Sequence, residues 1–253
     1  MDLKKHIYLD NAATTPLLPE VKEAMLPFLD SVYGNPSSTH FFGRKAKAAI
    51  ELARKKIAEI LNVRPSEIYF TSGGTEADNM ALNIAVENLD IETIISSPIE
   101  HHAVLNTAEG LKNKVNLKYV SLKENGVIDL ENLELLLQEN PRALISLMHA
   151  NNEIGNLLPI KKVSRLAEKY GAVFHSDAVQ TVGHYQINLE KIDQLHLLSA
   201  SAHKFHGPKG IGFLFIRNGF RLKAFIKGGP QERELRAGTE NVAGIVGMAK
   251  ALE

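Results

Sequence analysis

Short runs of apolar and β-branched residues alternate with longer amphipathic segments along most of the chain. The strand-like runs are IYF (68–70), TIISS (93–97), LKYVSL (117–122), ALISLMH (143–149), AVFHS (172–176), LHLLSA (195–200) and GIGFLFI (210–216). Most of them are separated by segments in which apolar positions recur with a helical repeat. Strands that alternate with helices in this way predict an α/β fold with a mainly parallel sheet flanked by helices.

The clearest amphipathic segment predicts a helix from Phe42 to Leu61. Its Arg and Lys side chains are expected to lie on the face opposite the apolar one. A second helix is predicted from Leu18 to Leu29, followed by a Gly-Asn-Pro-Ser-Ser loop at 34–38. The apolar face of the longer helix is predicted to consist of Ala46, Ala49, Ile50, Ala53, Ile57, Ile60 and Leu61.

The helix that follows strand 68–70 is predicted to begin at Thr75. Threonine is a favourable N-cap, and Asp78 stands three residues later in a position that resembles a capping box. The turn Ser72-Gly73-Gly74-Thr75 that opens this helix offers free backbone N–H groups and the positive end of the helix dipole, which suit a phosphate. No Lys-Ser/Thr pair follows the glycines, so the pattern of a nucleotide P-loop is absent.

Composition and charge narrow the classes of function. The chain has 253 residues, of which 44% are hydrophobic and 23% charged, as is ordinary for a soluble globular protein. It has 29 basic and 29 acidic side chains, so no net field favours a nucleic acid or an anionic membrane as partner. The sequence shows no signal peptide and no apolar run of membrane-spanning length, and we expect a cytoplasmic protein.

The sequence contains no cysteine at all. This absence excludes disulfides, thiolate metal sites and a thiol nucleophile within this chain.

Polar clusters follow the predicted strands at the point where each strand ends. In an open parallel sheet, ligands bind in the crevice beyond the carboxyl ends of the strands. We therefore expect these polar side chains to converge on one edge of the sheet. The candidates are Thr75, His101, Asn152, Asp177, Gln180 and Lys204.

An acid after one buried strand and a lysine after another, beside a phosphate turn, are the groups needed to hold pyridoxal 5′-phosphate (PLP). Lys204 would form a Schiff base with the aldehyde, Asp177 would pair with the protonated pyridine nitrogen, and His101 would cover the ring. Each residue taken singly also has a plain structural explanation. Lys204 could be a solvated loop lysine, Asp177 a turn cap, and His101 a polar residue at a strand end.

A series of motifs then resembles one family over nearly the whole chain, in order and with similar spacing. The sequence is similar to the cysteine desulfurases of the class V aminotransferase group, within PLP-dependent fold-type I. The motifs are YLDNAATTP (8–16), NPSSTH (35–40), TSGGTEADN (71–79), EHHAV (100–104), HANNEIG (149–155), SDAVQ (176–180), SASAHKFHGPKGIG (199–212) and GGPQERELRAGTEN (228–241).

The resemblance implies a role for each matched residue. Lys204 would anchor the cofactor, Asp177 would pair with the ring nitrogen, and His101 would stack on the ring and help to move protons. Gln180 and Asn152 would bind near the ring oxygen. The phosphate would be held by Gly74, Thr75, Ser201 and His203, joined by Thr239 from a second subunit.

The resemblance also implies a seven-stranded sheet in a PLP-binding large domain at 18–253, and a homodimer. Residues 1–17 would form an N-terminal arm that belongs with a smaller domain. The family would convert L-cysteine to L-alanine and an enzyme-bound persulfide, and pass the sulfur to an acceptor or scaffold protein for iron–sulfur cluster or thio-cofactor assembly.

The family's persulfide cysteine and its carboxylate-binding arginine belong to a C-terminal segment of the small domain. We expect that segment to be missing from this chain and the chain alone to be inactive.

Two other functions remain open on the sequence. The chain could act as a non-catalytic PLP-binding or dimerisation module, because it lacks the thiol. It could also be a metal hydrolase, a class suggested by its ten histidines. That alternative would use His101, His102, His149, His175 and the pair His203 and His206, with Glu153 and Asp177.

Overall fold

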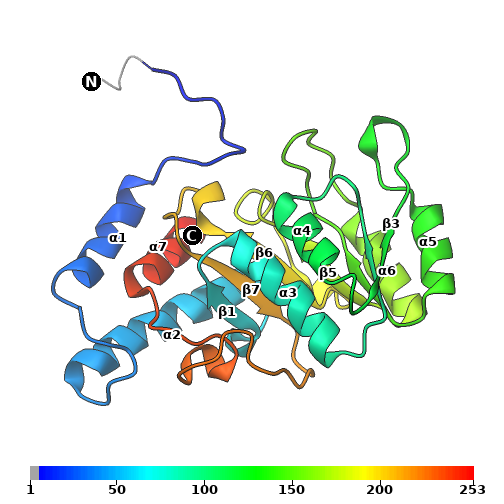
Figure 1. Cartoon of the computed structure of the whole chain (residues 1–253). Helices are drawn as coiled ribbons and strands as arrows, with labels where there is room; N and C mark the ends of the chain where they lie inside the picture. The colour runs from blue at the N-terminus through cyan, green and yellow to red at the C-terminus, as the bar shows by residue number, and fades with distance from the viewer. Residues whose placement is uncertain (1–5) are drawn as a thin grey trace.

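The computed structural model describes residues 6–253 and confirms an α/β fold with a mostly parallel seven-stranded sheet (Figure 1). Each predicted strand is present, although most are shorter than the apolar run that predicted them. The strands are β1 (Ile68–Thr71), β2 (Thr93–Ser96), β3 (Asn116–Tyr119), β4 (Ala143–Ser146), β5 (Val173–Asp177), β6 (Leu197–Ser201) and β7 (Gly212–Ile216).

The helices fall where the helical periodicity predicted them. They are α1 (Pro19–Leu29), α2 (Phe41–Leu61), α3 (Gly74–Asn88), α4 (His102–Gly110), α5 (Leu130–Glu139), α6 (Ile160–Tyr170) and α7 (Val242–Leu252). Short 3₁₀ turns add η2 (Pro65–Glu67), η3 (Glu124–Gly126), η4 (Leu189–Lys191), η5 (Ala202–Lys204) and η6 (Gln231–Glu234). Within residues 6–253, none of the helices is both long enough and apolar enough to span a bilayer.

The strand order is β1-β7-β6-β5-β4-β2-β3. All neighbours from β6 to β3 pair in parallel, whereas β7 is antiparallel to both β6 and β1. The carboxyl ends of β2, β4, β5 and β6 therefore meet at one edge of the sheet, where the loops that follow them can form a binding crevice.

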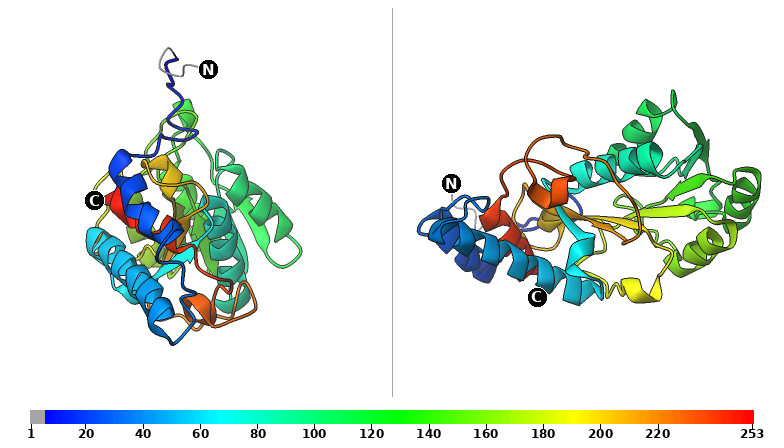
Figure 2. Two further views of the ribbon diagram at one scale, coloured as in Figure 1. Left: turned by 90° about the vertical axis from the view of Figure 1, so that its left-hand side faces the viewer. Right: turned by 90° about the horizontal axis from the view of Figure 1, so that it is seen from below.

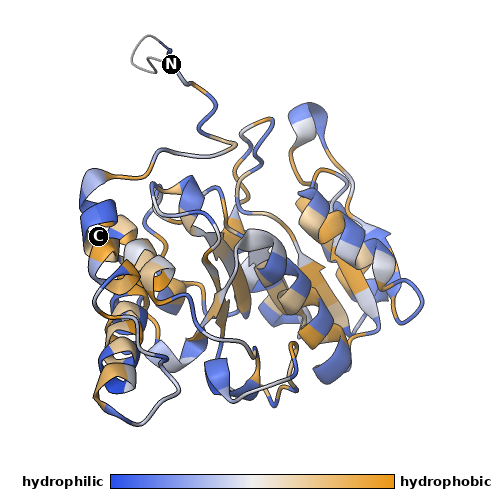
Figure 3. Cartoon of the chain, turned by 60° about the vertical axis from the view of Figure 1, so that its left-hand side comes forward, coloured by the Kyte–Doolittle hydropathy of each residue, from blue (hydrophilic) through white to orange (hydrophobic). Residues whose placement is uncertain are grey.

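Helices cover both faces of the sheet (Figure 2). One core lies under α2, α5, α6 and α7, and the other lies under α3 and α4. Strand side chains alternate between these cores. In β7, Phe213 and Phe215 enter the first, while Leu214 and Ile216 enter the second. β7 is thus apolar on both faces, as expected of a strand between two layers of helices. Figure 3 shows orange, hydrophobic stretches in the strands, between helices of mixed colour.

The sequence prediction for α2 is wrong at two positions. Ile60 is 36% exposed at the edge of the apolar face, whereas Arg54 is only 3% exposed. Arg54 is buried because Glu232 neutralises it, with Nη2 and Oε1 of the two side chains 2.8 Å apart. A buried charge needs such a partner, and this partner is not visible in the local pattern of α2.

The predicted start of α3 is also wrong. The helix begins at Gly74 with Gly73 at the N-cap position, and no side chain caps it. Glu76, not Asp78, reaches back to the preceding turn, where its Oε2 accepts from Ser72 N at 2.8 Å. Asp78 instead points into the protein and is 1% exposed. The glycines allow the chain to turn into the helix without a threonine cap.

Candidate active site

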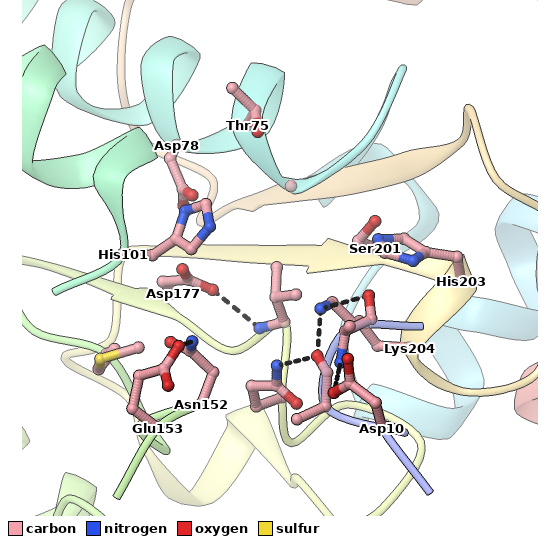
Figure 4. Close-up of a pocket in the computed structure, with 16 residues that line it drawn as sticks. Asp10, Thr75, Asp78, His101, Asn152, Glu153, Asp177, Ser201, His203 and Lys204 are labelled. Carbon is pink, nitrogen blue, oxygen red and sulfur yellow. Dashed lines mark hydrogen bonds between the residues drawn. The ribbon is translucent and has the colours of Figure 1, made fainter. Parts of the chain in front are cut away.

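The crevice at the carboxyl edge of the sheet holds a cavity of about 550 Å³. Figure 4 shows side chains from α3, β5, the β6–β7 loop and the N-terminal arm around it. All but one of the ten residues predicted for the cofactor site line this cavity. Those that do are Gly74, Thr75, His101, Asn152, Asp177, Gln180, Ser201, His203 and Lys204.

Thr239 does not line this cavity. It lies in a separate hollow of about 230 Å³, together with Ser72, Arg236 and Glu240. The sequence assigned Thr239 to the site of a second subunit, and a single chain does not test that assignment. Its role across a dimer interface stays a prediction.

Asp177 ends β5 on the floor of the cavity and is 5% exposed. Its Oδ1 accepts one hydrogen bond, from Val179 N at 2.9 Å. Burial, followed by the charge of the nearby Asp78, raises the pKa of Asp177 to about 7. A buried carboxyl that accepts a single hydrogen bond is suited to bind a cation or an N–H donor in the cavity.

Lys204 lies in η5, directly after β6, and its amine reaches the cavity. Nζ donates to the backbone carbonyls of Ala12 and Ala13, the latter at 3.0 Å. Burial lowers the pKa of Lys204, although Asp177 and Asp10 act in the opposite direction. A lower pKa increases the fraction of neutral amine, which is the form that attacks an aldehyde.

The N-terminal arm packs on the loop that carries Lys204. Thr15 N and Thr15 Oγ1 both donate to His203 O at 2.9 Å, and His206 N donates to Thr15 Oγ1 at 2.7 Å. Gln180 Nε2 donates to Ala12 O at 2.9 Å. The sequence placed residues 1–17 with a separate small domain. That division stays a prediction, and its first five residues lie outside the described ones.

His101 has both a structural and a site role. It is the N-cap of α4, where its Nδ1 accepts from Ala103 N at 3.1 Å. An Nδ1 that accepts leaves the proton of the neutral imidazole on Nε2. The sequence offered a polar residue at a strand end as the structural explanation of His101 and did not predict this cap, which fixes the tautomer of a ring that also lines the cavity.

The turn before α3 can hold a phosphate. The first intrahelical bond runs from Ala77 N to Gly73 O, so the N–H groups of Gly74, Thr75 and Glu76 precede the bonded part of the helix. Ser201 and His203 lie on the same side of the cavity. A Cβ on Gly74 would stand 2.6 Å from Val179 Cγ2, so only glycine lets the turn approach this wall of the cavity.

We expect Gly74→Ala to weaken PLP binding at least tenfold. The added methyl group must displace Val179 or the turn, and either shift misplaces the phosphate donors. The matched control is Gly110→Ala, where the new methyl group meets nothing within 4 Å. Fluorescence titration with PLP would measure both affinities. Equal affinity in the two variants would contradict the proposed cradle.

A metal centre has no support in the described part of the chain. Between residues 6 and 253, no group of three or more His, Asp and Glu side chains could hold a metal ion. The two histidines that the metal hypothesis paired make other contacts. His203 Nδ1 contacts Thr14 Oγ1, and His206 Nδ1 contacts Pro16 O.

Sequence reasoning missed several residues of the cavity. Two groups had a usable signal, because Asp10, Ala12 and Ala13 belong to the motif YLDNAATTP and Glu153 to HANNEIG. The sequence signal of Asp78 was misleading, because its position near a helix start suggested a capping role. Val179 belongs to the motif SDAVQ, but its apolar side chain suggested no chemical role.

Comparisons with known proteins identify the family of the chain. The family described as Aminotransferase class-V matches residues 7–253. The cysteine desulfurase IscS of Dictyoglomus turgidum is 50% identical over 99% of this chain, and that of Methanosarcina thermophila is 48% identical over 98%. The chain spans 64% and 62% of the length of these two relatives.

Two solved structures share the fold. A NifS-like protein has a TM-score of 0.93 at 46% identity, and the match covers 97% of this chain and 68% of the chain of that protein. A structure titled SspA in complex with cysteine has a TM-score of 0.92 at 36% identity, covering 98% and 72%.

The fold is that of the α/β proteins of PLP-dependent fold-type I. Within that class, the chain belongs to the class-V aminotransferase family.

Proposed function

We propose that the chain forms the PLP-binding part of a cysteine desulfurase. The observation that carries the proposal is a single cavity in which a buried acid, a lysine amine and the open N-terminus of α3 face one another. The named relatives support the same function, since the first of them are cysteine desulfurases. Because the chain spans only about 64% of their length, the activity belongs to the proposal.

The residues of the cavity match the chemical groups of PLP. Asp177 would pair with the ring nitrogen, and Lys204 Nζ would hold the aldehyde carbon. The α3 turn with Thr75, Ser201 and His203 would bind the phosphate. When bound, PLP supplies an electron sink for the electron pair released from a substrate carbon.

The side chains of this chain orient the reactants and hold protons. Asp177, once ionised, offers its negative charge at the floor of the cavity. His101 would cover the ring with its Nε2–H available for hydrogen bonding. The Lys204 amine would take up and return a proton in the cavity. Asn152 and Gln180 would complete the polar rim, as their places in the cavity allow.

We propose L-cysteine as the substrate, in keeping with the cysteine complex of the SspA structure. Since the 253 residues include no cysteine, the thiol that receives the sulfur would come from outside them. We also propose a homodimer in the cytoplasm and a sulfur-accepting or scaffold protein as its partner, for iron–sulfur cluster or thio-cofactor assembly.

The test of this function is to add PLP and then L-cysteine to the purified chain. We expect visible absorbance from bound PLP and a change in that absorbance when cysteine is added, but no release of alanine. L-Serine is the matched control, because it has a hydroxyl group in place of the thiol. Alanine is expected when a longer form of the protein that contains a cysteine is used.

The absence of a thiol also favours a second function, a PLP-binding module without desulfurase activity. A longer, thiol-containing form that binds PLP but releases no alanine would favour it. A lack of PLP absorbance would contradict both functions.

A further inference from the structure

A row of polar side chains lies in the core beneath α3, where the rest of the face is apolar. Residues two apart on a strand share a face, so His175 and Asp177 of β5 point to the same side as Ser199 of β6 and Ser146 of β4. Asp78 of α3 faces this row. Buried polar groups cost stability, and such a row beside a binding cavity calls for a functional explanation.

Asp78 has the fewest hydrogen-bonding and charged partners in the row. It is 1% exposed and lines the same cavity as Asp177. Within the part of the chain that the structure describes, its buried Oδ1 has no hydrogen-bond partner. The closest basic atom is His175 Nε2, at 3.5 Å from Oδ1, which is too far for a strong charge-assisted bond.

His175 does not supply a positive charge to Asp78. Its two ring nitrogens contact Ser146 Oγ at 2.9 Å and Ser199 Oγ at 3.0 Å. Burial lowers the pKa of His175 to about 4, so the ring is neutral at physiological pH. Asp78 thus lies in an apolar core next to a neutral imidazole and hydroxyl groups.

The other titratable groups around Asp78 are Glu100, His101, Asp177 and, across the cavity, Lys204. Glu100 is a further buried acid, whose Oε1 accepts from Met148 N at 3.0 Å while its Oε2 has no partner among residues 6–253. Burial raises the pKa of Asp78 to about 7. Two neighbouring buried carboxyls repel each other when both are charged, so a charge on one disfavours a charge on the other.

We propose that Asp78 is a positioning residue for the cofactor. Buried beside Asp177 without a charged partner among the described residues, it sets the pH at which Asp177 gains the negative charge that pairs with the ring nitrogen. The inference rests on the proposed function, in which Asp177 pairs with PLP. Asp78 touches no reacting atom and acts only through the ionisation of Asp177.

The charge coupling predicts a pH dependence that can be measured without PLP. For Asp78 and Asp177 the folded-state pKa is raised from 3.8 to about 7, so the folded state binds more protons than the unfolded state between these values. The contribution of these two acids to the free energy of unfolding therefore falls as pH rises from about 4 to about 7, whereas the buried His149, His175 and His196, whose pKa is lowered to about 4, act in the opposite direction. Removing one of the two acids must make that fall smaller.

The experiment compares urea unfolding of the full chain without PLP at pH 5 and pH 8, for the wild type and Asp78→Asn. We expect the unfolding equilibrium constant of Asp78→Asn, relative to that of the wild type, to be at least tenfold smaller at pH 8 than at pH 5, because the variant lacks one of the buried acids that lose a proton at a cost in the folded state. Asp30→Asn removes an exposed acid, and its ratio to the wild type should be the same at both pH values. The same ratio at both pH values in Asp78→Asn would overturn the inference.

PLP titration of the same variants separates the inference from the proposed function. Without Asp78, Asp177 ionises at a lower pH, so Asp78→Asn should bind PLP about fivefold more tightly than the wild type at pH 6 and within twofold at pH 8. Affinity that drops equally at both pH values would show a purely structural role and overturn the inference. Failure of the wild type to bind PLP would overturn the proposed function, whatever the unfolding data show.

If Asp78→Asn does not fold, carbon-13 NMR of labelled aspartates in the wild type gives the same answer. At least one buried carboxyl should titrate near pH 7. Titration of every aspartate below pH 5 would overturn the inference.

Discussion

Lys204→Ala is expected to abolish covalent attachment of PLP to the chain. Among the residues that line the cavity, Lys204 provides the only primary amine, and the predicted link joins its Nζ to the aldehyde carbon. Incubation with PLP followed by borohydride should add the mass of one reduced cofactor to the wild type and none to the variant. Peptide mapping should place the adduct on Lys204.

The matched control for this experiment is Lys209→Ala. Lys209 is an exposed lysine five residues further along the same loop, and it does not line the cavity. Its variant should be labelled as fully as the wild type. Residual labelling of Lys204→Ala at another lysine, with unchanged visible absorbance, would contradict the assignment of Lys204 as the anchor.

The convergence of the site could be predicted because it follows from topology. In a parallel sheet every strand ends at the same edge, so polar residues that follow neighbouring strands lie near one another. Asp177 after β5 and Lys204 after β6 therefore meet, although each alone is better explained as an ordinary cap or loop residue. The argument needed only the order of strands and polar clusters.

The contributions of distant segments could not be predicted in the same way. The arm around Ala12 contacts the Lys204 loop through backbone carbonyls, which leave no trace in a pattern of side chains. Asp78 looked like a helix cap because helix starts attract acids, and only the packing of α3 on β5 shows that it is buried. Contacts between segments that are far apart in sequence decided these positions.

Arg54 is the clearest example of this limit, since its partner Glu232 is 178 residues away in sequence. Arg54 Nη1 donates to Glu232 Oε2 at 2.9 Å and to Ile68 O at 2.7 Å. Glu232 Oε2 also accepts from Phe70 N at 2.8 Å. The pair fastens the 228–241 segment, which carries Thr239, to α2 and β1.

The same pair holds a strained turn. Glu232, Arg233 and Glu234 all have positive φ values, of 42°, 55° and 65°. Each such residue costs about 1–3 kcal/mol, so the turn persists only because other contacts hold it. The buried ion pair is one of those contacts, and its loss should weaken the hold on the turn.

Arg54→Met is therefore expected to lower the free energy of unfolding by about 3–5 kcal/mol, because it leaves the Glu232 carboxylate buried without its partner. Urea unfolding would measure the change. Lys55→Met is the matched control: its exposed pair with Glu59, at 3.8 Å, should contribute less than about 1 kcal/mol. The double variant Arg54→Met with Glu232→Gln should recover at least half of the loss, since no charge then remains buried and the glutamine can still accept from Phe70 N. A loss below about 1 kcal/mol in Arg54→Met would mean that the pair does not hold the strained turn.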